Sequence, residues 1–393
     1  MKKSGIDQML RLLFTTLLFA PLFASETFVS SKICRTCHPL IYKEYYGSMH
    51  RKASIYNDPV HNAVWQRHPL RQKGRYNCAP CHSPSDTKLM EALEAKRTAL
   101  PEPNEIQKEE PIGCSYCHRI ASILPGDKAN GNLLGKKERH YFAAKEGKSE
   151  KWVLEYHKKS ALMGLSKKSS GSPFHTIDYS NSGFSNGKIC IGCHAFKKNG
   201  HGFEVCSMDL ERSKKGERNC ITCHMPQVSG PRSTLSETGT HAFHGFAGLH
   251  NRPDLLARNI KLTLQKANGK LMVTLENEAD HTLFAHPLRL GQLRVRILRN
   301  KEEIILPPVD FYTILGADGK AAPPWSAREV LKQNRIEAHE TLRIPFDLPL
   351  RPKDRVTVTF GCYIVEPERA EKLGIDPDSP SNWRPLKTIH SVF

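Results

Sequence analysis

Long apolar segments are scarce in this 393-residue sequence. The clearest one, residues 12–24, is too short to cross a bilayer comfortably, because a membrane-spanning helix needs about 20 apolar residues. No later segment is long and apolar enough, which excludes a protein with several membrane spans. Hydrophobic residues make up only 39% of the chain, below the roughly 45–50% usual for globular domains. Such a chain either stays disordered or gains apolar surface from bound groups.

The N-terminal run is typical of a secretory signal. Lys2, Lys3 and Arg11 precede the apolar residues, and we expect cleavage after Ala24, so that residues 1–24 form a signal peptide. An uncleaved signal that keeps the protein at the membrane is the alternative. The prediction is an exported, periplasmic protein.

Ten of the twelve cysteines occur in one repeated pattern, Cys-x-x-Cys-His. This is the attachment signature of c-type haem, in which two thiols take the vinyl groups and the histidine ligates the iron. A single copy would also suit half a zinc site or a redox pair, but neither explains a histidine directly after every pair. We therefore predict five covalently attached haem c groups, bound at Cys34, Cys37 and His38; Cys78, Cys81 and His82; Cys114, Cys117 and His118; Cys190, Cys193 and His194; and Cys220, Cys223 and His224.

Two cysteines, Cys206 and Cys362, lie outside the repeats. They fall in different predicted domains, so we expect two unpaired thiols; a disulfide between them is the alternative.

Negative charge is also in short supply, since 40 acidic residues face 58 Lys and Arg and give a net charge of +18. Loss of residues 1–24 would leave +16. Five haems add about ten propionate charges, which brings the loaded ferrous protein to roughly +6. The basic composition therefore does not indicate nucleic-acid binding, and it is compatible with an anionic substrate or an acidic redox partner.

The chain divides into a motif-rich part and a β-rich part. Residues 25–257 hold all five motifs, and we expect a mainly α and irregular multihaem cytochrome domain with helices such as Ser85–Arg97 and one near Glu150–Leu165. From about residue 258 apolar and polar residues alternate, which predicts an antiparallel β-sandwich over 258–365. Asn268-Gly269 suits a two-residue hairpin turn. Residues 366–393 are expected to form a C-terminal tail along the surface.

The sixth iron ligands must come from the fourteen histidines outside the motifs. Imidazole on both faces gives a low-spin iron that shuttles electrons, whereas an open position lets the iron bind a small molecule. A lone histidine is ordinarily a surface or hydrogen-bonded residue. Sequence context favours four as distal ligands: His50, His175, His241 and His140.

Two stretches resemble the cytochrome c554 family. They are Ser31–Ser54, with its aromatic-rich segment and S-x-H-x-x-A, and the I-G-C-S-Y-C-H of Ile112–His118. Cys220–Pro226 with His241–Gly245 is similar to larger multihaem cytochromes that carry a β-rich C-terminal domain. The resemblance implies stacked haem pairs, with His50 capping a haem other than its own. It also implies that the haem on His82 lacks a strong sixth ligand; His157 or His175 is the alternative occupant there.

Two functions fit these features, and no second cofactor motif or catalytic constellation distinguishes them. The first is an electron carrier working with redox partner proteins, such as a membrane quinol dehydrogenase or another cytochrome. The alternative is an oxidoreductase acting on hydroxylamine, nitrite or a similar small nitrogen or sulfur compound at one open haem, with His82 as the candidate. A third hypothesis, compatible with either function, is that the β domain docks a partner and makes this chain a subunit of a larger complex.

Overall fold

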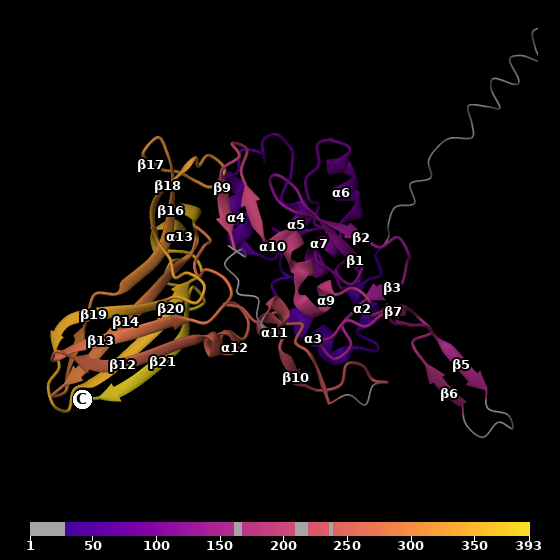
Figure 1. Cartoon of the computed structure of the whole chain (residues 1–393). Helices are drawn as coiled ribbons and strands as arrows, with labels where there is room; N and C mark the ends of the chain where they lie inside the picture. Colours follow the sequence, from indigo (N-terminus) through magenta and orange to yellow (C-terminus); the bar gives the residue numbers. More distant parts are fainter. Residues whose placement is uncertain (1–27, 161–166, 209–218, 236–238) are drawn as a thin grey trace, which may run out of the picture.

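The structure is a computed structural model that describes residues 28–160, 167–208, 219–235 and 239–393. The predicted signal peptide lies outside these residues. Figure 1 shows two parts side by side, one built from short helices and small strand pairs, the other from long strands that end at the C-terminus. We call them the motif-bearing part, residues 28–259, and the β part, residues 260–393. None of the helices in the described ranges combines the length and apolarity needed to span a membrane.

The helices of the motif-bearing part are short, and several begin at a side-chain cap. Asp58 accepts hydrogen bonds from the backbone N–H groups of Val60 and His61, and Asp86 accepts one from Leu89. The predicted helix at 85–97 is thereby confirmed with Asp86 as its cap. The helices are α2 (Ser31–Cys34), α3 (Pro39–Gly47), α4 (Pro59–Arg67), α5 (Ala79–His82), α6 (Thr87–Glu94), α7 (Glu105–Glu109), α8 (Cys114–Cys117), α9 (Gly183–Asn186), α10 (Ile191–His194), α11 (Cys220–His224) and α12 (Pro253–Leu256).

Small sheets of two or three strands lie between these helices, all antiparallel except for the parallel pair β3 and β7, so the part contains more strand than the sequence predicted. The expected helix near 150–165 is wrong for its described residues, because β4 and β5 lie there. The strands are β1 (Ile120–Leu124), β2 (Gly131–Leu134), β3 (His140–Phe142), β4 (Val153–Leu154), β5 (His157–Ser160), β6 (Lys167–Ser170), β7 (Thr176–Asp178), β8 (Phe196–Lys198), β9 (Glu204–Ser207), β10 (Gln227–Ser229) and β11 (Thr240–Ala242).

Two antiparallel sheets form the β part, as the alternating sequence predicted. The smaller has the order β12 (Ile260–Ala267), β13 (Lys270–Asn277), β19 (Thr341–Pro349). The larger runs β17 (Lys320–Ala321), β16 (Val309–Ala317), β14 (Leu290–Arg299), β20 (Arg355–Tyr363), β21 (Trp383–Val392), with β15 (Glu302–Ile305) on β14 and β18 (Glu329–Asn334) on β16. Alternate side chains from both sheets, such as Val273 and Val295, share one apolar core.

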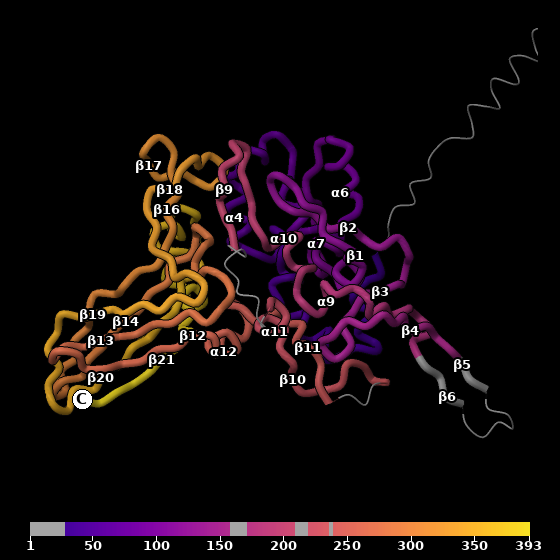
Figure 2. The backbone as a smooth tube through the Cα atoms, in the orientation of Figure 1, coloured from indigo at the N-terminus to yellow at the C-terminus, as the bar shows by residue number. Residues whose placement is uncertain are grey.

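The sequence made predictions for two features of the β part, the turn at Asn268-Gly269 and the C-terminal segment. Asn268 and Gly269 both have positive φ and close the β12–β13 hairpin, as a two-residue turn of this kind requires. The last segment was expected to lie along the surface as a tail. It instead contains α13 (Pro367–Leu373) and then β21, which pairs with β20 along its length. In Figure 2 the chain passes from the motif-bearing part into the β part near α11 and α12.

Candidate haem-binding site

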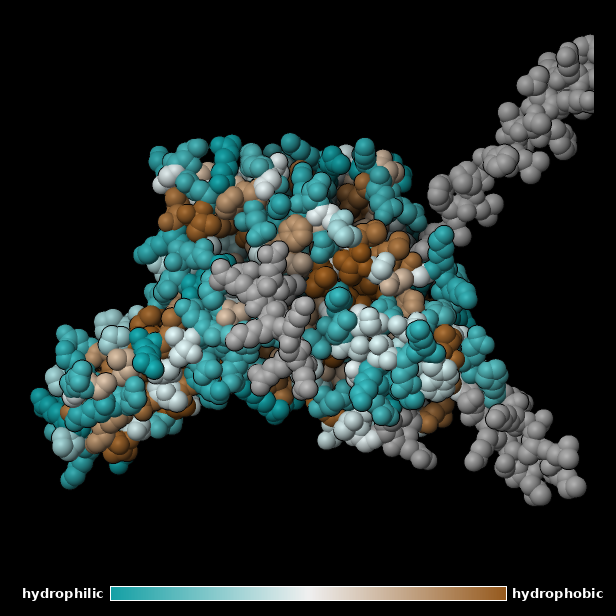
Figure 3. All heavy atoms as spheres, viewed as in Figure 1, coloured by the Kyte–Doolittle hydropathy of each residue, from teal (hydrophilic) through white to brown (hydrophobic). Residues whose placement is uncertain are grey.

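One cavity of about 3200 Å³ runs through the motif-bearing part, and all five motifs line it. Figure 3 shows apolar side chains gathered near α10 and β1 on the same part. Apolar walls with a few histidines and thiols suit a porphyrin, whose faces are apolar and whose iron takes nitrogen ligands.

Single-turn helices present the thiols and histidine of each motif together. The backbone N–H of His38 bonds the carbonyl of Cys34 at 2.8 Å, and His82 and His118 bond Cys78 and Cys114 at 3.0 Å. This i to i+4 bond places the first cysteine, the second cysteine and the histidine on neighbouring positions of one helical turn. The spacing of the motif therefore brings all three groups to one wall of the cavity.

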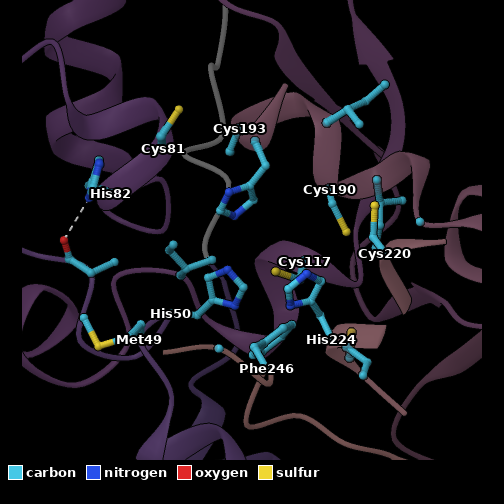
Figure 4. Close-up of a pocket in the computed structure, with 18 of the residues that line it drawn as sticks. Met49, His50, Cys81, His82, Cys117, Cys190, Cys193, Cys220, His224 and Phe246 are labelled. Atoms are coloured by element: carbon cyan, nitrogen blue, oxygen red, sulfur yellow. Dashed lines mark hydrogen bonds between the residues drawn. The ribbon is translucent and has the colours of Figure 1, made fainter. Parts of the chain in front are cut away.

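The motif histidines are oriented through their Nδ1 atoms. His38 donates to the carbonyl of Arg232 and His118 to that of Phe142, both at 2.7 Å, while His224 donates to Ala247 at 2.6 Å. Such a bond fixes the tautomer and leaves the Nε2 lone pair for a metal. The dashed line in Figure 4 marks the corresponding bond of His82, 3.1 Å from the Ala53 carbonyl.

Four motif histidines have a second histidine across the cavity, and we call these second residues the opposing histidines. Metal–nitrogen bonds of about 2 Å on both sides, plus roughly 1 Å from each nitrogen to its ring centre, require a centroid spacing of about 6 Å. The observed spacings fit an iron between the rings. They are 6.3 Å for His38 and His175, 6.0 Å for His194 and His50, 6.2 Å for His118 and His244, and 6.2 Å for His224 and His281.

Burial keeps several of these imidazoles neutral. It is the main cause that lowers the pKa of His50, His82 and His244 to about 3, and neighbouring histidines add to the effect. The neutral imidazole is the form that ligates a metal. Nδ1 of His50 and of His175 is buried without a hydrogen-bond partner among the described residues, so neither ring has its tautomer fixed by a hydrogen bond at Nδ1.

Of the four predicted distal residues, two lie opposite motif histidines and two have other partners. His50 and His175 lie opposite motif histidines, as given above. His241 is buried with Nδ1 on the Gly230 carbonyl and Nε2 3.1 Å from the Glu44 carboxylate, so both of its nitrogens already have partners. His140 pairs with Asp178 at 3.0 Å.

Sequence reasoning did not favour the other two opposing residues, His244 and His281. His244 lies three positions after His241, so the residue that opposes His118 comes from the same H-A-F-x-G segment as the predicted His241. His281 follows β13 of the β part, where no motif marks it. Its Nδ1 bonds the carbonyl of Thr282 at 3.1 Å.

His82 differs from the other motif histidines. Its ring contact among the described residues is with His61, at a centroid spacing of 4.0 Å, too short to hold an iron between them. Nδ1 of His61 bonds the same Ala53 carbonyl as His82 does, and its Nε2 lies 3.3 Å from the Tyr76 hydroxyl. His61 therefore stands beside His82 and not across the cavity from it. Of the alternative occupants, His175 lies opposite His38.

The motif thiols also meet one another. Cys34 lies close to Cys114, Cys81 to Cys193, and Cys190 to Cys220. Figure 4 shows the last pair with its sulfurs adjacent. Gly187, at φ +78°, lies so close that a Cβ there would be 2.8 Å from the Cβ of Cys220. These contacts make motif one adjacent to three, two to four, and four to five.

A solved structure has the same overall fold. The penta-heme cytochrome c552 from Thermochromatium tepidum matches with a TM-score of 0.69 over 93% of this chain and 99% of that chain, at 22% sequence identity. Residues 33–119, which hold three of the motifs, match the profile of the family described as cytochrome c554 and c-prime. The chain is a multihaem c-type cytochrome. No curated protein matches this cytochrome. Electron transfer is the general function of its class.

Proposed function

We propose that this cytochrome carries five haem c groups and passes single electrons between redox partner proteins in the periplasm. The observation that carries the proposal is the set of four histidine pairs spaced at 6.0–6.3 Å along one cavity. An iron held by two imidazoles changes little on reduction, which suits rapid electron exchange. The thiol contacts support two groups of neighbouring haems, at motifs one and three and at motifs two, four and five, within one cavity.

The proposed partners are a membrane quinol dehydrogenase or another cytochrome, with an acidic docking face. The net charge of +18 before haem attachment supports an acidic partner, since complementary charge accelerates encounter. The N-terminal segment supports export. The two sheets of the β part, which share a core in the manner of a sandwich, offer a separate surface for docking.

Spectroelectrochemical titration of the intact protein tests this function. We expect five electrons to be taken up and returned reversibly, with mass spectrometry of the polypeptide giving five attached haems. Fewer than five haems, or an oxidised protein that a soluble electron donor cannot reduce on a subsecond scale, would contradict the proposal.

A second candidate function is reduction or oxidation of a small nitrogen or sulfur compound at the haem on His82. The observation that favours it is the absence, among the described residues, of a ring contact that would give His82 an opposing histidine at about 6 Å. The haem supplies the redox chemistry when bound, and the four paired haems would deliver electrons. Steady-state oxidation of a reduced dye by nitrite or hydroxylamine tests it; no turnover with any such compound would exclude it.

A further inference from the structure

A loop of the β part closes one end of the haem cavity. Residues 278–289 connect β13 to β14, and all twelve line the cavity. The loop carries His281, which opposes His224. Five residues later it carries His286, and three residues beyond that Arg289.

The loop is held firmly to the β part. Asn277 is fully buried and donates to the carbonyls of His281 and Glu337 at 3.1 and 2.9 Å. The Thr282 hydroxyl donates to the Glu337 carboxylate at 2.8 Å, and Phe284 packs on Phe360 with ring centroids 5.7 Å apart. A loop fixed in this way presents its side chains to the cavity in set positions.

His286 has the opposite tautomer from the ligating histidines. Its Nδ1 accepts a hydrogen bond from the Leu288 backbone N–H at 3.2 Å, whereas Nδ1 of His38, His118 and His224 bonds a carbonyl. An Nδ1 that accepts requires the proton of a neutral ring to be on Nε2. Nε2 of His286 is then an N–H donor and has no lone pair for an iron.

The His286 side chain is solvent-exposed and lies among the residues that line the cavity. Desolvation by the surrounding protein atoms lowers its pKa to about 3, and Arg289, His82 and Arg369 are the charged or titratable groups that act on it. His82 is the one motif histidine among these neighbours. The other four motif histidines already have opposing partners, so His286 stands near the one haem position without such a partner.

Arg289 brings a positive charge to the same place. Its Nη1 donates to the Ile364 carbonyl at 2.8 Å, which is its one acceptor among the described residues. A guanidinium carries five N–H groups, so donors remain for a ligand. Asp58, the cap of α4, and His250 also lie near Arg289. Arg369 is already paired with the Glu366 carboxylate at 3.3 Å, whereas Arg289 has no ion pair within the described residues and keeps its charge for a ligand.

We propose that His286 and Arg289 form a donor pocket over the open face of the haem attached at Cys78 and Cys81, and that this pocket binds a small oxyanion such as nitrite. The inference rests on the second candidate function and narrows its substrate class. An N–H donor and a guanidinium both bind acceptor oxygens, and the positive charge favours an anion over a neutral molecule such as hydroxylamine.

Ligand binding to the intact ferric protein tests the pocket, with optical and electron paramagnetic resonance (EPR) spectra as the readout. Nitrite is the anionic probe and imidazole the neutral one. Arg289→Gln is expected to weaken nitrite binding roughly tenfold or more while changing imidazole binding less than about twofold, because the lost interaction is charge-assisted. Arg289→Lys keeps the charge and should lose less. Arg343→Gln, an exposed residue of β19, is the matched control and should change neither.

The outcomes separate the pocket from the open haem itself. If the protein binds neither probe, the open position fails and the pocket with it. If both probes bind but Arg289→Gln weakens neither selectively, the haem is open and the pocket is refuted. His286→Leu should weaken nitrite binding without changing the number of low-spin haems. A loss of one low-spin signal in that variant would make His286 an iron ligand and overturn the proposal.

Discussion

Single histidines in this cytochrome take different roles according to what binds their two nitrogens. His118 and His224 donate from Nδ1 to a carbonyl and keep Nε2 for a metal. His241 has both nitrogens occupied by Glu44 and Gly230, and His286 accepts at Nδ1. The residue type is the same in each case, so the hydrogen-bond partner decides between ligand, structural residue and donor.

Replacing His50 by Ala tests the role of an opposing residue. His50 lies 6.0 Å from His194 across the cavity, and its ring also packs on Phe246 at 4.0 Å. We expect the variant to convert one low-spin haem to high-spin in the ferric EPR spectrum, because the iron on His194 loses its second imidazole. His241→Ala is the control and should leave all spin states unchanged. An unaltered spectrum for His50→Ala would refute the ligand role.

Gly187→Ala tests the close approach of two motifs. The new Cβ would sit 2.8 Å from the Cβ of Cys220, and the φ of +78° would add about 1–2 kcal/mol of backbone strain. Incomplete haem attachment is expected, seen as lower mass of the purified polypeptide. Gly147→Ala has nearly the same φ, +77°, with open space around it, so it isolates the strain from the clash. Full loading of both variants would show that the contact is unimportant.

At the level of single residues, the attachment cysteines and motif histidines could be predicted from the sequence, whereas the full set of distal histidines could not, for a physical reason. Attachment cysteines and motif histidines follow from a local pattern that one helical turn satisfies. Distal partners do not, because the rings that face each other are far apart in sequence, such as His38 and His175 or His224 and His281. His241 was favoured over His244 because sequence gives no sign of Glu44, which lies 197 positions away and binds His241.

At the level of elements, the β part could be predicted better than the motif-bearing part. Alternation of apolar and polar residues has one cause, a half-buried strand, and it predicted the strands of β12 and β13 directly. Residues 150–160 carry short strands where a helix was expected, because β4 pairs with β7 and β5 with β6. Pairing with β20 likewise made a strand of residues 383–392.

Asn277→Ala tests whether the loop of residues 278–289 positions His281. The change removes two donated bonds and one accepted bond from a fully buried side chain. Each carbonyl left unpaired costs about 1–3 kcal/mol. We expect the haem on His224 to become partly high-spin as His281 loses its fixed position. Asn334→Ala, on exposed β18, is the control. A fully low-spin haem on His224 in Asn277→Ala would show that the loop holds its place without this residue.

At the scale of the whole molecule, the two parts share one cavity. The motif-bearing part supplies every attachment cysteine, and the β part supplies His281, His286 and Arg289. Only 39% of the residues are hydrophobic, and the large apolar core of side chains lies in the β part. The motif-bearing part is instead arranged around the cavity proposed to hold the haems. Four histidine pairs and one exception are the basis of the proposed electron-transfer haems and of the proposed reactive position at His82.

Quantitative EPR of the fully oxidised, intact protein tests this account most directly. Spin integration should give four low-spin haems and one high-spin haem per chain, and the high-spin signal alone should respond to added nitrite. Five low-spin haems would contradict the open position at His82. More than one high-spin haem would contradict the four histidine pairs.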